Sequence, residues 1–229
     1  MKYINQLAVL LFLIIVLPSC KKDEHTDVPL ATMRIANIVT GGTVAKLAGV
    51  STTNINNNGS AYFGMFAGNP DIYVYPIDDS LHPYYHANKS VEMKENEYFT
   101  LFICGTPDTP ESVLVKENYT FHSDSVGGIR FINLSPNSTP VNVTLSTNAS
   151  VNEFENIAYK GITDFKLYPA TSAITSYVFE VRAADNPAVI LASFTINTES
   201  VFRFLNATLV FRGLVGGSPA PGISRIVHL

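Results

Sequence analysis

Four side chains that can bind a metal ion or transfer protons stand within one short stretch of the chain: Asp78, Asp79, His82 and His86. Carboxylate oxygens and imidazole nitrogens are ligands for Zn²⁺ or Ca²⁺. Pro83 separates the two histidines, which argues against placing both on one face of a regular helix. Nothing in the spacing fixes a coordination geometry. We therefore expect a solvated polar loop, with no metal and no cofactor.

The same stretch carries the adjacent aromatic residues Tyr84 and Tyr85. Tyrosine offers an apolar ring and a hydroxyl at a low cost in side-chain entropy, which suits recognition of a sugar or a protein. A loop from Pro76 to Lys89 without secondary structure of its own would be unusually long, and such loops are usually functional or disordered. The alternative is that both tyrosines pack onto their own domain. The candidate binding residues are Asp78, Asp79, His82, Tyr84, Tyr85 and His86.

A catalytic constellation is not evident elsewhere. The sequence contains no Gly-x-Ser-x-Gly, His-Glu-x-x-His or phosphate-binding glycine pattern. An enzyme needs a nucleophile, a base and an orienting group brought together. We therefore expect a protein that is not an enzyme, with a hydrolase kept as a remote alternative.

Cys20 is a candidate site of lipid attachment. Lys2 is followed by eleven apolar residues, Leu7 to Leu17, a run too short to span a bilayer core of about 20 helical residues. The segment ends in Leu-Pro-Ser-Cys, which resembles the lipobox of bacterial lipoproteins. That resemblance implies a signal peptide over residues 1–19, and residues 20–30 are then the lipidated cysteine and a flexible tether.

The residues after Cys20 bear on localisation. Lys21-Lys22-Asp23-Glu24 resembles the surface-export signal of Bacteroidota lipoproteins, which implies an outer-membrane anchor facing the cell exterior. The periplasmic face is the alternative. The formal net charge is −4 and there is no basic cluster, so we expect no binding to nucleic acid.

The chain must then fold into elements that position these groups. Arg34 and Asn37 are echoed by Arg130 and Asn133, 96 positions later, and similar features follow each pair. We therefore predict two tandem modules, residues 31–122 and 123–229. Aromatic and β-branched residues in short alternating runs, joined by Gly, Pro and Asn turns, predict an all-β fold of two antiparallel sandwiches, Ig-like or Greek-key, with one wet face on each sheet.

Individual strands follow from the same alternation. Tyr177–Arg182 should send Glu180 and Arg182 to solvent, and Cys104 should be a buried residue in a strand. The other expected strands are Met33–Val39, Ala61–Phe66, Ile72–Tyr75, Ser90–Met93, Tyr98–Cys104, Val113–Lys116, Val141–Leu145, Ala192–Ile196, Val201–Leu205, Thr208–Phe211 and Ile223–His228.

The second module resembles the domain-of-unknown-function 4397 family of bacterial envelope proteins. The resemblance rests on Arg130-Phe131-Ile132-Asn133-Leu134-Ser135-Pro136 and on Val141-Asn142-Val143. The first module is similar but lacks the Ser-Pro pair. Membership implies a β-sandwich at the cell envelope and transfers no catalytic residues.

These observations favour a lipid-anchored, non-catalytic binding or adhesion module whose ligand is a glycan or a protein. The alternative is a structural or assembly component of an outer-membrane surface complex, which would use exposed strand edges for its partners.

Overall fold

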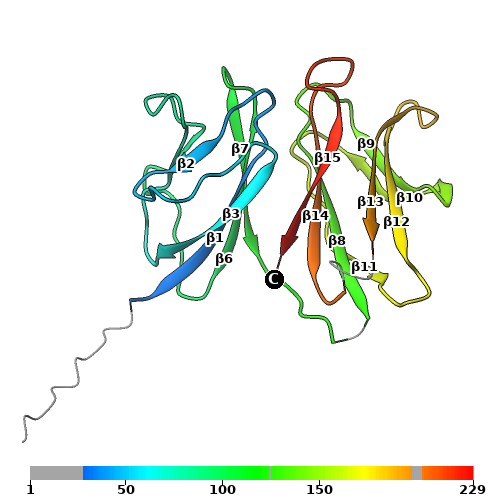
Figure 1. The fold of residues 1–229 in the computed structure, drawn as a ribbon, viewed down its shortest axis with the longest axis horizontal. Coiled ribbons are helices and arrows are strands. Elements are labelled where there is room, and N and C mark those ends of the chain that lie inside the picture. The colour runs from blue at the N-terminus through cyan, green and yellow to red at the C-terminus, as the bar shows by residue number, and fades with distance from the viewer. Residues whose placement is uncertain (1–27, 124, 198–202, 229) are drawn as a thin grey trace, which may run out of the picture.

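The computed structural model describes residues 28–123, 125–197 and 203–228, and these form an all-β protein of fifteen strands in four sheets (Figure 1). The described ranges contain no helix. The strands build two sandwich modules that lie side by side, so the prediction of tandem β-sandwiches is confirmed. Residues 1–27, including Cys20 and the expected tether, lie outside the described part of the chain.

The first module packs a four-stranded sheet against a three-stranded one. The larger sheet has the order β3 (Gly59–Phe66), β1 (Leu30–Asn37), β6 (Tyr98–Gly105) and β7 (Pro110–Glu117). The smaller sheet has the order β2 (Ala45–Leu47), β4 (Tyr73–Pro76) and β5 (Tyr85–His86). The strands run antiparallel except for β1 and β6, which pair in parallel.

The second module repeats this plan. One sheet has the order β11 (Lys166–Pro169), β8 (Val126–Asn133), β14 (Asn206–Arg212) and β15 (Gly222–His228). The other has the order β10 (Asn148–Ile157), β9 (Val141–Leu145), β12 (Ser176–Ala183) and β13 (Ile190–Asn197). Again one pair, β8 and β14, is parallel. The added strand β10 is the main difference between the modules.

The repeated asparagines have the same structural role in both modules. Asn37 and Asn133 are fully buried at the ends of β1 and β8. The Asn37 amide donates to the carbonyl of Ile55 at 3.1 Å, and the Asn133 amide donates to that of Ile157 at 3.1 Å. Each buried amide thus ties the end of its strand to a later segment of the same module, and this shared role explains why the residue recurs.

The sheets that contain β1 and β8 pack against each other and will be called the inner sheets. Their central strands β1 and β8 are buried on both faces, because one face packs on the same module and the other on the neighbouring module. In β8, Phe131 faces its own module's core while Ile132 joins an inter-module cluster. In β6, Leu101 and Phe102 divide in the same way. The expectation of one wet face on every sheet is therefore wrong for the inner sheets.

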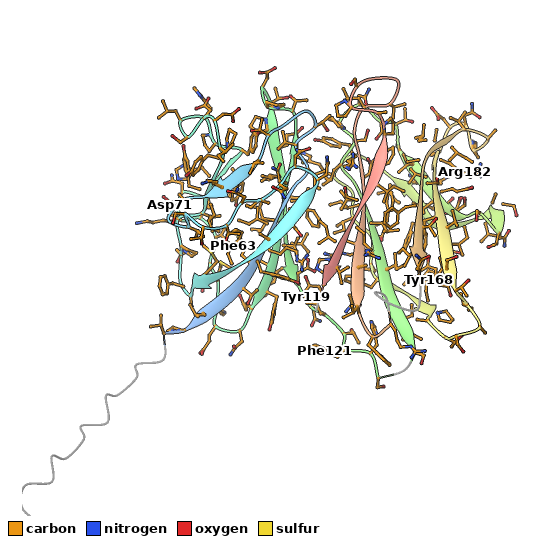
Figure 2. All side chains as sticks on the ribbon, viewed as in Figure 1. Phe63, Asp71, Tyr119, Phe121, Tyr168 and Arg182 are labelled. Carbon is orange, nitrogen blue, oxygen red and sulfur yellow. The ribbon has the colours of Figure 1, made fainter. Side chains whose placement is uncertain are left out.

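A cluster of hydrogen-bonded polar side chains lies at one end of the interface between the two modules. The Arg130 guanidinium donates to the Glu117 carboxylate at 2.8 and 2.5 Å, and both side chains are almost fully buried. The Tyr119 hydroxyl and the Thr208 hydroxyl each lie 2.7 Å from a ring nitrogen of His228. Figure 2 shows Tyr119 between the two modules.

Burial and the charges of Arg130 and Arg34 lower the pKa of His228 to about 2, so the ring is neutral. A neutral ring at this site avoids an additional buried cation.

Several strand predictions need correction. Residues 90–93 form no strand, and only Met93 makes an isolated bridge, to Gly68. The prediction for residues 201–205 lies partly outside the described residues, and Arg203 and Phe204 form a turn. Strands β2, β5, β10 and β11 were not predicted.

Glu180 and Arg182 are not sent to solvent. Their side chains pair at 2.5 Å with only 14% and 11% exposure. Arg182 also donates to the Thr144 hydroxyl of β9 and to the carbonyl of Pro187. The Arg182 side chain therefore lies along its own sheet, with its methylene groups buried and its guanidinium hydrogen-bonded.

Candidate functional site

The predicted loop lies at the end of the first module opposite to the start of β1. It connects β4 to β5 over eight residues, Ile77 to Tyr84, and faces the hairpin between β6 and β7. The corresponding connection of the second module, between β12 and β13, has six residues, 184–189. The loop is thus shorter than the expected Pro76–Lys89, because Tyr85 and His86 pair with β4 as strand β5.

Asp79 organises the tip of the loop. Its carboxylate accepts the backbone N–H groups of Leu81 and His82 at 3.0 and 3.3 Å, and lies 2.7 Å from Nδ1 of the His82 ring. The hydrogen bond to the His82 ring and that from Leu81 hold the pKa of Asp79 below its usual value. The carboxylate is therefore charged at neutral pH and fixes the turn.

Thr43, from the turn after β1, ties the base of the loop to the module. Its hydroxyl donates to Asp78 at 2.9 Å, and its backbone N–H donates to the Tyr84 hydroxyl at 3.2 Å. The Tyr84 ring is 6% exposed and belongs to the core of the first module. Tyr84 therefore packs onto its own sandwich, which was one of the two alternatives. Part of its side chain still reaches the molecular surface.

A hollow of about 730 Å³ opens between this loop and the β6–β7 hairpin. Its walls combine carboxylates with proline and tyrosine rings. The lining residues are Thr43, Pro76, Asp78, Asp79, Leu81, His82, Pro83, Tyr84, Pro107, Asp108 and Pro110. Such a surface offers hydrogen-bond acceptors beside flat apolar faces, which can hold a polar ligand that carries hydroxyl or amide groups.

Four of the six predicted site residues meet in this hollow, and two do not. Tyr85 is half-buried against the module core, and burial raises the pKa of its hydroxyl. His86 lies 2.9 Å from the Asp71 carboxylate and packs edge-on to Tyr73. Strand pairing explains the difference, because Tyr85 pairs with the buried Val74 and faces the core, whereas His86 pairs with Tyr73 and points to the opposite face of the sheet.

Two features of the described residues bear on metal binding and on thiol chemistry. Over residues 28–123, 125–197 and 203–228, no group of three or more His, Cys, Asp or Glu residues could hold a metal ion. Cys104 is fully buried in β6, as predicted, and burial raises the pKa of its thiol to about 11. A thiol in that state is not a nucleophile at neutral pH.

Three residues of the hairpin contribute to the hollow without having been predicted: Pro107, Asp108 and Pro110. They lie in the stretch Thr106-Pro107-Asp108-Thr109-Pro110, whose turn chemistry is legible in the sequence. The sequence does not reveal that this hairpin lies close to Asp78, because their proximity depends on the packing of one sheet on the other.

Comparison with known proteins finds no matching family model and no match among curated proteins. The resemblance to the domain-of-unknown-function 4397 family therefore stays a prediction. No helix long and apolar enough to cross a membrane occurs among the described residues.

Proposed function

We propose that this protein is a lipid-anchored cell-envelope protein that uses the hollow of its first module as a non-catalytic binding or adhesion site. The observation that carries the proposal is the position of the hollow. It lies beside Thr43 and the β6–β7 hairpin, whereas the chain enters the module at Val28 and Leu30, at the opposite end (Figure 1). An anchor at Cys20 would therefore leave the hollow open toward the surroundings.

The chemistry of the hollow supports a ligand rich in hydroxyl or amide groups, such as a glycan or a protein segment. Asp78 and Asp79 are already bonded to Thr43 and His82, so the walls are preorganised. The Asp108 side chain is exposed on the facing hairpin. Carboxylates fixed before binding lose less entropy when a ligand arrives.

The proposed localisation is the outer membrane, facing the cell exterior, with the periplasmic face as the alternative. Support comes from the lipobox-like Leu-Pro-Ser-Cys and from Lys21-Lys22-Asp23-Glu24. The test is a Cys20→Ala variant, expressed in a bacterium with lipoprotein processing. We expect it to leave the detergent phase and to carry no acyl groups by mass spectrometry. Normal cleavage and unchanged partitioning of the variant would refute the anchor.

The binding site is tested with full-length protein in detergent on an array of purified cell-surface glycans and on immobilised matrix proteins. For any glycan or matrix protein bound, Asp108→Ala should weaken binding about tenfold, which corresponds to about 1.4 kcal/mol. The control is Asp185→Ala, an exposed aspartate in the β12–β13 connection of the second module. Equal affinities for both variants would remove the hollow from consideration.

The alternative role, a structural or assembly component of a surface complex, would use a free sheet edge. The edge strand β10 is poorly suited because its pairing with β9 is interrupted by three register shifts, and such bulges obstruct edge-to-edge pairing. The edge strand β13 pairs with β12 in a more regular register and is the better candidate for this role.

A further inference from the structure

Most of the exposed large apolar side chains of the described residues lie at one end of the molecule. This is the end where β1 begins. Thirteen such side chains are exposed among the described residues. Seven of them gather at this end: Val28, Leu30, Phe66, Tyr98, Phe121, Leu167 and Phe204. We call this set the apolar rim.

Strand register places the rim at one end. Leu30 opens β1 and faces Phe66, the last residue of β3. Tyr98 opens β6, which runs parallel to β1. In the second module, Leu167 pairs with Gly128 near the start of β8, and the backbone N–H of Phe204 donates to Val126 at the same place.

The opposite end differs in kind. Its exposed large apolar residues are aliphatic: Ile77 and Leu81 of the β4–β5 connection, Val189 of the β12–β13 connection, and Ile190, which begins β13. Four of the five exposed aromatic rings in the described chain belong to the rim. Phenylalanine and leucine side chains insert into the boundary between the headgroups and the acyl chains, and tyrosine can place its ring there with its hydroxyl in water.

Phe121 is held outward by its neighbours. Its side chain is 82% exposed and lies at the lower edge of the molecule (Figure 2). The buried Asn206 donates to the carbonyl of Thr120 at 2.9 Å, and its side-chain oxygen lies 2.9 Å from the ring of His122. A Cβ at Gly128 would approach the Asn206 oxygen to 2.2 Å, so a glycine there leaves room for this clamp.

We propose that the apolar rim rests on the lipid surface to which the chain is anchored, so that both modules stand on the membrane with the hollow pointing away. The inference rests on the proposed anchor at Cys20. Eight residue steps separate Cys20 from Val28, which can span at most about 28 Å. The tether therefore keeps Val28 and Leu30, which belong to the rim, within that distance of the bilayer surface.

The chain contains no tryptophan, so a single introduced one reports its own surroundings. Phe121→Trp places it in the rim, and Leu81→Trp is the matched control, because Leu81 is 81% exposed at the opposite end. Full-length lipidated protein is reconstituted into vesicles of phosphatidylethanolamine and phosphatidylglycerol with brominated acyl chains. Phe204→Trp repeats the test in the second module.

We expect emission from Phe121→Trp and Phe204→Trp to shift to the blue and fall by about half, because interfacial side chains reach the depth of the upper acyl chains. Emission from Leu81→Trp should not change. If the protein floats with vesicles but no rim tryptophan is quenched, the anchor stands and the rim proposal is wrong. Equal quenching at both ends also overturns it.

Two further outcomes can be distinguished from contact between the rim and the membrane. A blue shift that depends on protein concentration and not on bromine would mean that the rim binds a second copy, which overturns the proposal. Protein that neither floats nor carries acyl groups on Cys20 would overturn the proposed function and this inference together.

Discussion

The ion pair between Glu117 and Arg130 should couple the two modules into one unfolding unit. Glu117 ends the last strand of the first module, and Arg130 lies in the first strand of the second. Their side chains are 1% and 6% exposed, and the pair is bidentate. Arg130 also donates to the Thr208 hydroxyl at 2.8 Å and lies 4.6 Å from the centre of the Phe165 ring. These contacts hold the guanidinium in place if its carboxylate is removed.

Glu117→Ala would leave a buried cation without a counter-ion. Breaking a buried pair in this way costs about 3–5 kcal/mol, because the desolvation of the remaining charge is no longer offset. Removing both charges should cost less, so Glu117→Leu combined with Arg130→Met should recover at least about 1 kcal/mol of the loss. The variants are compared by urea unfolding at pH 7, followed by circular dichroism.

Lys116→Ala is the matched control, one residue away. Lys116 pairs with Glu97 at 2.5 Å, but its side chain is 62% exposed, so its loss should cost less than about 1 kcal/mol. The reasoning fails if Glu117→Ala is no more harmful than Lys116→Ala. A smaller slope of the unfolding free energy against urea concentration, or two separate unfolding transitions, would show that the modules had uncoupled.

Other predictions concern single buried groups. The pKa of His228 is depressed in the folded protein, so His228 destabilises the fold as the pH falls below its unfolded pKa of about 6.5. Between pH 7 and pH 5, the free energy of unfolding of the wild type should fall by about 2 kcal/mol more than that of His228→Gln. Equal decreases in the two proteins would contradict a buried neutral ring. Asn37→Ala and Asn133→Ala should each cost about 1–3 kcal/mol in urea unfolding, since each removes two hydrogen bonds donated by a fully buried amide. A loss of stability confined to one of the two variants would contradict the shared role. In a Cys20→Ala background, Cys104 should react with iodoacetamide at pH 8 only when urea is present, and modification of native protein would show that the strand opens.

The candidate site was only partly predictable from the sequence. Residues 78–84 stood out by their types, and the structure places Asp78, Asp79, His82 and Tyr84 in one hollow. Tyr85 and His86 have the same residue types and follow directly in sequence, so the sequence predicts them in the same site. Pairing with β4 turned these two away, and such pairing depends on a partner strand that the local pattern does not reveal.

The all-β class, the two repeated modules and most strands of the inner sheets are predictable from local sequence patterns. Alternation and turn residues act over a few positions, and the recurrence of Arg34 and Asn37 as Arg130 and Asn133 marks the repeat directly. The contact between the two inner sheets is not predictable in this way. Their strands are apolar on both sides, and a strand buried on two faces reads the same in sequence whatever covers it. The Glu117–Arg130 pair depends on that contact between the modules. The hollow lined by Asp108 depends on how the two sheets of the first module pack, and the apolar rim on where the strands of both modules begin and end.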